Sequence, residues 1–489
     1  MLRLPLSDRP HFAEQEGERL AGLARRAAAL PGVTVIVNEL VIPYERAWGN
    51  LTRRIDGSLN NVIRRINTVL RDLARHVANV HTVDCDHLAA CLGKRTWFDE
   101  RLWFHGKCFC HPDALPQVAG QALDIIRVAK GKPAKCIVLD LDNTLWGGII
   151  GDDGLDGIRL GELGDGEAYV RFQTYLHEFR ERGIILAVCS KNDDDKARSP
   201  FREHPDMVLK EDDIACFVAN WNNKADNIRL IAQRLNIGLD SMVFLDDSQF
   251  ERNLVRQLVP EVCVPELPED PAEFVPYLEA LNLFESIQFS AEDRARTEMY
   301  RANVQRQQEQ EQFTDVNAYL ASLQMTAAFE RFDDYHMPRI AQLVGRTNQF
   351  NLTTIRHPET ELRQFADDPD AVPCYASLED RFGDNGLVSV VIGRRQGDRM
   401  ELVTWLMSCR VIARRLEEFV LDRLVELARD AGIKTLAGRY VPTNKNALVA
   451  EHYPKLGFRP AGTEPDGTTL WELTVADHAP SDAPIKRKD

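Results

Sequence analysis

The chain has 489 residues, of which 44% are hydrophobic and 28% are charged, and its formal net charge is −15. This composition is typical of a globular protein of two to four domains, and the excess of acidic residues argues against nucleic acid as a partner. No apolar run approaches the roughly 18 residues of a membrane-spanning helix. The N-terminus turns polar too early for a signal peptide, so we expect a cytoplasmic protein without a membrane partner.

The ten cysteines are scattered along the chain. Three of them lie in or beside apolar runs: Cys136, Cys189 and Cys263. Because disulfide frameworks belong to much shorter secreted chains, buried free thiols are the expected state. Cys108, Cys110 and His111 resemble metal ligands, but Cys-x-Cys-His without a second cluster is a poor zinc site.

Residues 1–130 alternate helical and strand patterns. Helical spacing of apolar residues covers 18–30, 55–80 and 112–128, and short apolar strands cover 33–37 and 81–84. The segment resembles the SGNH-hydrolase-like α/β region that precedes some phosphatase domains. It has no Gly-Asp-Ser nucleophile block, so we expect a degenerate structural domain in which Asn38 and His111 are remnants of a site.

The most informative stretch follows a short linker. Residues 137–148 read Ile-Val-Leu-Asp-Leu-Asp-Asn-Thr-Leu-Trp-Gly-Gly, so a buried strand runs into Asp140 and Asp142. In an open α/β sheet this is the edge at which ligands bind. Two carboxylates there can hold Mg²⁺ and supply a nucleophile beside an acid–base group. Taken alone, the motif is also compatible with an Asx-capped turn.

Three later stretches decide between these readings. Ser190 and Asn192 follow the next apolar run, Lys224 precedes a helical pattern, and Asp246 and Asp247 end another strand. Acid pair, hydroxyl, lysine and acid pair in this order resemble the haloacid dehalogenase (HAD) superfamily of phosphoryl-transfer enzymes. The resemblance implies a three-layer, Rossmann-like α/β domain over residues 131–290.

The HAD resemblance also implies roles for these residues. Asp140 would attack phosphorus, and Asp142 would protonate the leaving oxygen and later activate water. Ser190, Asn192 and Lys224 would hold the phosphoryl oxygens.

A magnesium site is implied at the same place. Asp246 and Asp247 would complete it together with Asp140 and the backbone carbonyl of Asp142. One helix, 166–182, fills much of the space between the first two motifs, so we expect no large cap and an open site that suits a bulky or tethered substrate.

Residues 291–324 are charged and glutamine-rich, and predict a solvated helical linker. Residues 325–475 contain strand patterns at 387–394, 401–407 and 435–439 and a long amphipathic helix at 416–431. This order resembles the GNAT acyltransferase fold, an α+β domain. Residues 476–489 are polar, and we expect a disordered tail.

The loop before the long helix departs from the GNAT pattern. In that fold it cradles the coenzyme A pyrophosphate, but here Ala413 and Arg415 stand where glycines permit close backbone approach. Side chains at these positions crowd that approach, which argues against the use of acetyl-CoA. Arg410, Arg414 and Arg415 make a cationic helix start, which either receives the phosphopantetheine of an acyl carrier protein or is a solvated basic turn. Asn446 and Tyr453 belong to the same predicted carrier site.

The assembly of domains is similar to one family, the FkbH-like family, over residues 130–475 and more loosely before them. Five blocks carry the resemblance: 140–148 with 151–154, 348–354, 380–387, 407–411 and 439–446. The family takes a glyceryl unit from 1,3-bisphosphoglycerate, removes phosphate and loads the unit onto an acyl carrier protein for polyketide-type biosynthesis. The resemblance therefore implies Mg²⁺ as cofactor, with a phosphorylated three-carbon metabolite and a carrier protein as partners.

A thiol would carry the acyl group in such a route. Cys409 is the best candidate, because Arg410 at a helix start would lower its pKa, although it would equally pack at the strand end. Cys189 should point away from the site, and Cys374 has no apparent partner. Two further acid–base candidates in the third domain are His336 and Asp384.

Two alternatives stay open at this point. One is a plain phosphatase of a small metabolite, in which the C-terminal domain is structural. The other is a scaffold without catalysis, against which the complete set of HAD motifs argues.

Overall fold

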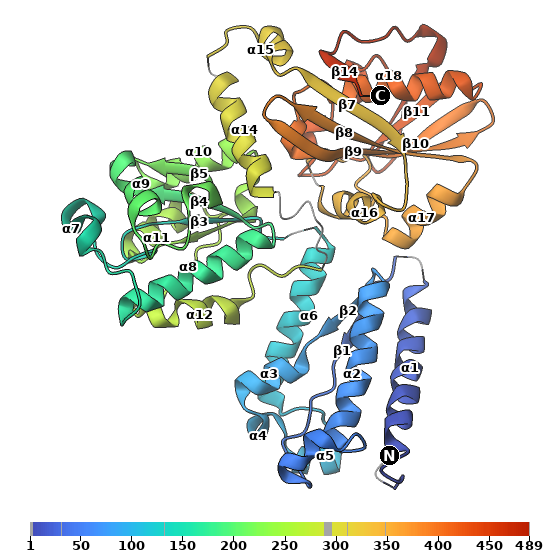
Figure 1. Ribbon diagram of the computed structural model, residues 1–489. Coiled ribbons are helices and arrows are strands. Elements are labelled where there is room, and N and C mark those ends of the chain that lie inside the picture. The colour runs from blue at the N-terminus through green and yellow to red at the C-terminus, as the bar shows by residue number, and fades with distance from the viewer. Residues whose placement is uncertain are drawn as a thin grey trace. The chain divides into compact units, whose positions relative to one another are not determined.

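The computed structural model describes residues 3–30, 32–131, 133–287, 296–310, 312–347 and 349–488 (Figure 1). The chain divides into two compact units. Residues 1–129 with 357–361 form the first, and residues 130–356 with 362–489 form the second.

The first unit is an α/β domain with a small parallel sheet, in which β1 pairs with β2. Alanines of α1 pack against aliphatic residues of α2, because small side chains allow the two helices to approach closely. Its elements are α1 (Arg9–Ala28), β1 (Val35–Asn38), η1 (Gly49–Arg54), α2 (Leu59–His76), β2 (Val80–Val83), α3 (Cys85–Leu92), α4 (Lys94–Trp97), α5 (Glu100–Gly106), η2 (Pro112–Ala114) and α6 (Leu115–Ala129).

The second unit begins with a four-stranded parallel sheet in the order β5-β4-β3-β6. The strands are β3 (Cys136–Leu139), β4 (Ile185–Ser190), β5 (Ile214–Ala219) and β6 (Met242–Leu245). Alternate residues of β3 enter two separate cores, because successive side chains of a strand point to opposite faces.

Helices cover both faces of this sheet. One core contains residues of α8 (Asp165–Glu181), α9 (Asp194–Glu203) and α12 (Phe274–Leu281). The other contains residues of α10 (Lys224–Leu235), α11 (Gln249–Leu258) and α14 (Arg296–Gln310). This is the three-layer α/β architecture that the sequence predicts. Between β3 and α8 lies only the short helix α7 (Ile150–Gly157), so no large cap is inserted there.

The predicted linker helix proves to be part of the core. Residues 291–295 of that prediction lie outside the described residues, and α14 follows them. Tyr300 and Val304 are buried with residues of α10 and β5, and Asn303 and Arg306 are buried as well. The expectation of a solvated helix is therefore wrong for this face of α14.

The C-terminal part is built on an eight-stranded sheet in the order β12-β13-β11-β10-β9-β8-β7-β14. Neighbouring strands are antiparallel except for two pairs, β10 with β11 and β14 with β7. The parallel pair β10 and β11 is joined through α18, and this arrangement confirms the predicted GNAT-like α+β fold. Its elements are α15 (Val316–Ser322), β7 (Met325–Arg331), α16 (Met337–Arg346), α17 (Glu359–Asp367), β8 (Ala371–Asp380), β9 (Gly383–Gln396), β10 (Arg399–Met407), α18 (Leu416–Asp430), β11 (Thr435–Tyr440), α19 (His452–Lys455), β12 (Arg459–Thr463), β13 (Thr469–Thr474) and β14 (Ile485–Arg487).

The C-terminal tail is ordered up to residue 488, which contradicts the prediction of disorder. Strand β14 pairs with β7, and the amide and hydroxyl of Ser481 donate to the Asp422 carboxylate of α18. A polar segment was expected to remain in water, but here a buried acceptor and a free sheet edge hold it in place.

Candidate active site

The four predicted motifs meet at one edge of the parallel sheet. Asp140 follows β3, Ser190 ends β4, Lys224 begins α10 after β5, and Asp246 follows β6. The strands are in register, and the amide of Asp140 donates to the carbonyl of Leu245 at 2.9 Å. The carboxyl ends of these parallel strands therefore bring the side chains together, as expected for this class of sheet.

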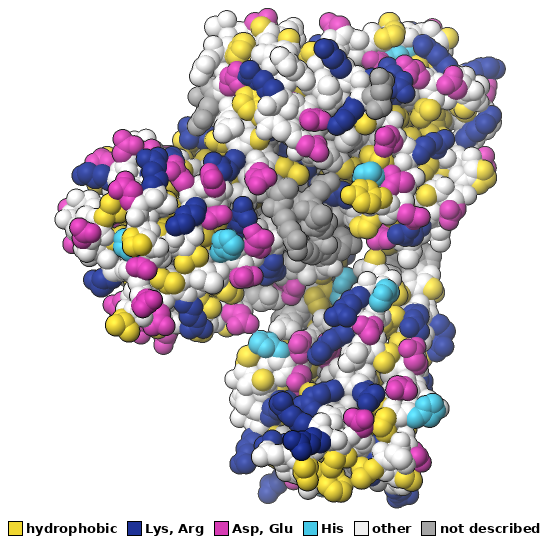
Figure 2. All heavy atoms as spheres, in the orientation of Figure 1, with side chains coloured by type: hydrophobic (Ala, Val, Ile, Leu, Met, Phe, Trp, Pro, Cys, Tyr) yellow, Lys and Arg dark blue, Asp and Glu magenta, His cyan; other side chains and the backbone are white. Residues whose placement is uncertain are grey.

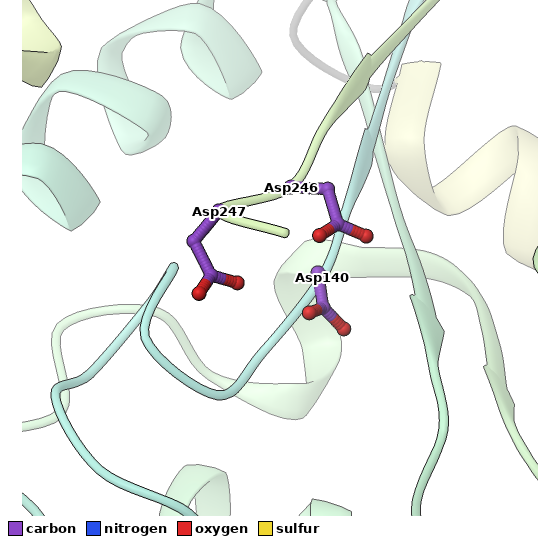
Figure 3. A group of neighbouring side chains, drawn as sticks. All are labelled: Asp140, Asp246 and Asp247. Carbon is purple, nitrogen blue, oxygen red and sulfur yellow. The ribbon is translucent and has the colours of Figure 1, made fainter. Parts of the chain in front are cut away.

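Three carboxylates face a single ammonium group. The Lys224 Nζ lies 2.9 Å from Asp140 Oδ1 and 2.6 Å from Asp246 Oδ2. Carboxylate oxygens of Asp140, Asp246 and Asp247 lie within 4.8 Å of one another (Figure 3). Asp140, Asp246 and Lys224 are buried, whereas Asp247 is exposed.

Burial and charge shift the pKa values of these groups. Burial, together with the negative charge of Asp140, raises the pKa of Asp246 to about 7, against the attraction of Lys224. Burial also raises the pKa of Asp247. For Lys224, burial by itself would lower the pKa, but the carboxylates of Asp140 and Asp246 outweigh it and raise the pKa. Lys224 therefore stays protonated, and its single positive charge is too small to neutralise the carboxylates of the site.

This donor set fits a divalent cation. Three carboxylates and one ammonium group leave an excess of negative charge in a largely buried site, which is costly without further compensation. Hard oxygen ligands at this spacing suit Mg²⁺, which is commonly bound by a few carboxylates and completes its shell with water and substrate oxygens.

The carboxylate of Asp142 lies in a separate environment. Its Oδ1 accepts from the indole of Trp146 at 2.9 Å and from the amide of Ile150 at 3.0 Å, and its Oδ2 accepts from the amide group of Asn192 at 2.9 Å. Burial raises the pKa of Asp142 despite these donors. The carboxylate is not part of the group that gathers around the cation position, so a metal role for Asp142 rests on its backbone carbonyl alone.

The predicted phosphate ligands line the same edge. Ser190 and Asn192 are buried, with exposed fractions of 2% and 4%. Because Asn192 donates to Asp142, it also fixes the orientation of that carboxylate. A phosphoryl-binding role for Ser190 and Lys224 stays a prediction. Ser190 ends β4 and Lys224 follows β5, and both strands lie on the same side of β3, which leads to Asp140.

Sequence reasoning missed three residues that hold this site together. Thr144 accepts from the amide of Asp247 at 3.2 Å, and Trp146 donates to Asp142. Arg252 donates to the carbonyls of Asp246 and Asp247 at 2.7 and 2.6 Å. Thr144 and Trp146 stand in the Asp-x-Asp block, where their spacing was a usable signal, whereas nothing local marks Arg252.

The chain itself fills the gap where β10 and β11 diverge. These strands pair only from Arg399 and Thr435 to Leu402 and Gly438. Beyond that point residues 350–352 lie between them. The amide of Leu352 donates to the carbonyl of Trp405 in β10, the amide of Met407 donates to the carbonyl of Phe350, and the amide of Val441 after β11 donates to the carbonyl of Leu352.

Asn446 and Tyr453, two of the predicted carrier-binding residues, lie under this segment. The Asn446 amide group donates to the carbonyls of Asn351 and Val441, both at 2.9 Å, and the residue is fully buried. Tyr453 is 1% exposed and packs against Trp405 and Phe458. Both side chains are buried within the folded chain, and the amide group of Asn446 is used in hydrogen bonds to the backbone. A carrier-binding role for the two residues stays a prediction.

The three arginines of the predicted carrier site have different partners. Arg414 is buried, pairs with Asp380 at 3.0 Å and donates to Asn303 of α14, and burial lowers its pKa to about 10. Arg410 is also buried and donates to Ser408. Arg415 pairs with Glu418 and Asp482. The alternative of a solvated basic turn is therefore wrong for the buried residues Arg410 and Arg414. A carrier-binding role for the three arginines stays a prediction.

Cys409, the predicted acyl-carrying thiol, is half-buried and far from the phosphoryl site. Its carbonyl accepts from Asn236, which caps the C-terminal end of α10. Lys224 begins the same helix, and its 12 residues span about 18 Å. Cys409 therefore cannot touch a phosphoryl group at Asp140. Cys189 and Cys374 are buried, and burial raises the pKa of both, to about 12 for Cys374.

The remaining sequence candidates do not form a second site with these residues. His336 contacts Asp333 at 2.7 Å and the Tyr375 hydroxyl at 2.9 Å, whereas the carboxylate of Asp384 accepts from the amide of Gly386 in a turn. In the first unit Asn38 ends β1, and the ring of His111 accepts from the amide of Asp113.

Comparison with known proteins identifies the family of this chain. Residues 2–127 match the profile of the FkbH N-terminal domain. The chain is 42% identical, with a TM-score of 0.55, to a crystal structure of the N-terminal part of protein BF1531 from Bacteroides fragilis, which contains a phosphatase domain and was determined in complex with Mg. The match covers 58% of this chain and 75% of that one. The chain belongs to the FkbH-like family.

Further solved structures match smaller parts of the chain at lower identity. The ribosomal-protein-S18-alanine N-acetyltransferase of Escherichia coli is 14% identical, covering 32% of this chain and 97% of that one, with a TM-score of 0.25. PaiA N-acetyltransferase of Thermoplasma acidophilum, determined in complex with coenzyme A, is 11% identical, covering 30% and 99%, with a TM-score of 0.25. No sequence among curated proteins matches the chain.

In the part of the chain that the structure describes, no helix has both the length and the apolar character needed to cross a bilayer.

Proposed function

We propose that this FkbH-like protein is a Mg²⁺-dependent phosphatase that acts through an aspartyl-phosphate on Asp140. The observation that carries the proposal is the buried group of Asp140, Asp246, Asp247 and Lys224 at the carboxyl edge of the parallel sheet. The related phosphatase domain that was crystallised with Mg supports the choice of metal.

The residues divide the reaction between them. Asp140 attacks phosphorus, and the phosphorus–oxygen bond to the substrate breaks while Asp142 gives a proton to the leaving oxygen. Water then attacks the aspartyl-phosphate, Asp142 takes the proton, and inorganic phosphate leaves. Lys224 holds a phosphoryl oxygen and balances the charge of Asp140. Bound Mg²⁺ would neutralise phosphoryl charge between the three carboxylates.

We further propose that the substrate is a three-carbon acyl phosphate, such as 1,3-bisphosphoglycerate, and that the product is a glyceryl thioester on an acyl carrier protein. The Cys409 thiolate attacks the acyl carbon, a carbon–sulfur bond forms, the bond between the acyl carbon and the phosphate oxygen breaks, and inorganic phosphate leaves. The phosphopantetheine thiol of the carrier then attacks this thioester, takes over the glyceryl group and releases the Cys409 thiol. The HAD site then hydrolyses the remaining phosphate ester. The family membership and the absence of a large insertion between β3 and α8 support a tethered substrate.

The test is a reaction with 1,3-bisphosphoglycerate, Mg²⁺ and a phosphopantetheinylated carrier protein, followed by intact-protein mass spectrometry. We expect the carrier to gain the mass of one glyceryl group without phosphate. A carrier that gains nothing while phosphate is released would contradict the transfer step. Cys409→Ser tests the thiol, since loss of transfer with retained phosphate release would assign Cys409 to the acyl relay.

A second candidate function is a plain phosphatase of a small metabolite. One observation favours it, because the gap between β10 and β11 and the residues around it are occupied by the chain itself. Phosphate release at an unchanged rate in the absence of any carrier, with no thioester formed in its presence, would establish this alternative.

A further inference from the structure

The first unit carries an exposed patch of aromatic and basic side chains at the end where α4 and α5 lie (Figure 1). In α5 and the turn after it, Trp103 is 50% and Phe104 is 68% exposed, and the Lys107 ammonium lies 5.2 Å from the Trp103 ring centre and 6.0 Å from that of Phe104. Arg101, one helical turn before Phe104, is also exposed. Unlike a single exposed aromatic side chain, a contiguous exposed group of them marks a surface for a partner.

A second segment joins the patch from the chain before α2. The Tyr44 hydroxyl donates to Glu100 of α5, and the Arg95 guanidinium lies 5.9 Å from the Tyr44 ring centre. We call Tyr44, Arg95, Arg101, Trp103, Phe104 and Lys107 the aromatic–basic patch. Figure 2 shows Lys and Arg side chains beside hydrophobic ones at this end of the unit.

The charge of the first unit differs in sign from that of the rest of the chain. Residues 1–129 and 357–361 contain 17 Lys and Arg against 16 Asp and Glu, whereas the remaining residues contain 43 against 59. The first unit lacks the large negative charge of the remainder, so its exposed basic side chains can attract an acidic partner that the remainder would repel. Exposed Trp, Phe and Arg side chains are also the types that contribute most of the binding energy at protein interfaces.

We propose that the aromatic–basic patch is the docking surface for the acyl carrier protein, a small acidic protein, and this inference rests on the proposed transfer function. The carrier's carboxylates pair with Lys107, Arg101 and Arg95. Trp103 and Phe104 pack against apolar side chains of the carrier that lie between those carboxylates. The occupied gap beside β10 leaves the C-terminal part without an open carrier site among the predicted residues, which is consistent with docking elsewhere.

The test compares binding and loading of a holo acyl carrier protein of type II fatty-acid synthesis by three full-length proteins. These are the wild type, the double variant Arg101→Glu and Lys107→Glu, and the control Arg25→Glu and Arg26→Glu at the C-terminal end of α1. The control pair is exposed in the same unit and carries the same charge change, but lies at the other end of it (Figure 1).

We expect the Arg101 and Lys107 variant to weaken carrier binding and raise the KM for carrier about tenfold or more, and the control variant to stay within twofold of the wild type. Phosphate release from a small phosphate ester should be equal in all three. Binding by the wild type should weaken as salt increases, because the contacts are between exposed charges.

The outcomes separate this inference from the proposed function. If the wild type neither binds nor loads the carrier, the transfer function fails and the docking surface with it. If the wild type loads the carrier and the patch variant does so with the same KM, only the docking surface is wrong. If the patch variant instead dissociates a dimer of the wild type without a change in carrier binding, the patch is a self-association surface and the proposal is overturned.

Discussion

At the scale of single residues, the site is defined by an unequal charge balance. Among the described residues, Lys224 is the cation that pairs with the carboxylates of the buried residues Asp140 and Asp246, and Asp247 adds a third carboxylate. Without a metal, Lys224 is what makes burial of these carboxylates tolerable. The same side chain is placed to bind the transferred phosphoryl group, so one residue serves both stability and chemistry.

Substituting Lys224 should therefore affect activity and metal dependence together. We expect Lys224→Met to lower phosphatase kcat/KM at least about 100-fold, since it removes a charged phosphoryl ligand. We also expect Mg²⁺ to raise the Tm of this variant more than that of the wild type, because the uncompensated carboxylates gain more from a bound cation.

Lys196→Met is the matched control for this experiment. Lys196 is largely exposed and pairs only with exposed Asp193, so both its activity and the Mg²⁺ effect on its Tm should stay close to those of the wild type. A Lys224→Met protein with wild-type activity would remove Lys224 from the mechanism.

The acidic residues of the site could be predicted from sequence because each stands at a strand end with a local pattern. Arg252 could not, since only the fold brings its guanidinium to the carbonyls of Asp246 and Asp247. The burial of Asn446 could not be predicted for the same reason. Its partner Asn351 lies 95 positions earlier, and no local pattern shows that this segment covers it.

At the scale of elements, the segment 350–352 lies where β10 and β11 diverge. It adds hydrogen bonds to β10 after the pairing with β11 ends, so the gap between these strands is closed by backbone. The sequence predicted the strands and the long helix correctly, because apolar periodicity encodes them. It did not predict what lies between two strands, since that depends on a distant segment.

Helix α19 supplies a pH-dependent contribution to stability. His452 begins this helix, packs with its ring centre 4.5 Å from that of Trp405, and has its pKa lowered to about 3 by burial, with a smaller effect of Lys455. The unfolded chain binds a proton at His452 below about pH 6.5, whereas the folded chain does not. The free energy of unfolding therefore falls as pH drops below about 6.5, by about 1.4 kcal/mol per pH unit.

Denaturant titrations of the wild type and His452→Leu at pH 7.5 and 5.5 check this. The Leu variant cannot take up the proton, so its free energy of unfolding should fall by about 1.4 kcal/mol less over this interval. Equal pH dependence of the two proteins would show that His452 is not kept neutral by the fold.

At the scale of the whole second unit, α14 joins the HAD sheet to the C-terminal sheet. Tyr300 and Val304 pack on one side, while Arg306 pairs at 2.7 Å with Asp380, which also binds Arg414. The sequence marked α14 as a solvated linker because its glutamines and charges dominate the composition. Its few buried residues are the ones that determine its position.

Asp380 should be important for this connection. The Asp380 side chain is fully buried, so Asp380→Ala leaves two buried guanidinium groups without their carboxylate, and we expect a loss of about 3–5 kcal/mol in the free energy of unfolding. Glu309→Ala, which removes the more exposed pair with Arg381, should cost less than about 1 kcal/mol. Equal losses in denaturant titrations would show that the buried pair does not hold the two sheets together.

The central claim is that Asp140 accepts the phosphoryl group. Rapid acid quenching after mixing with a ³²P-labelled phosphate ester and Mg²⁺ measures this directly as label on the protein. We expect transient label on the wild type, longer-lived label on Asp142→Asn with a substrate whose leaving group needs no proton, and none on Asp140→Asn. Label that persists on Asp140→Asn, or a wild type that turns over without ever carrying label, would contradict the account.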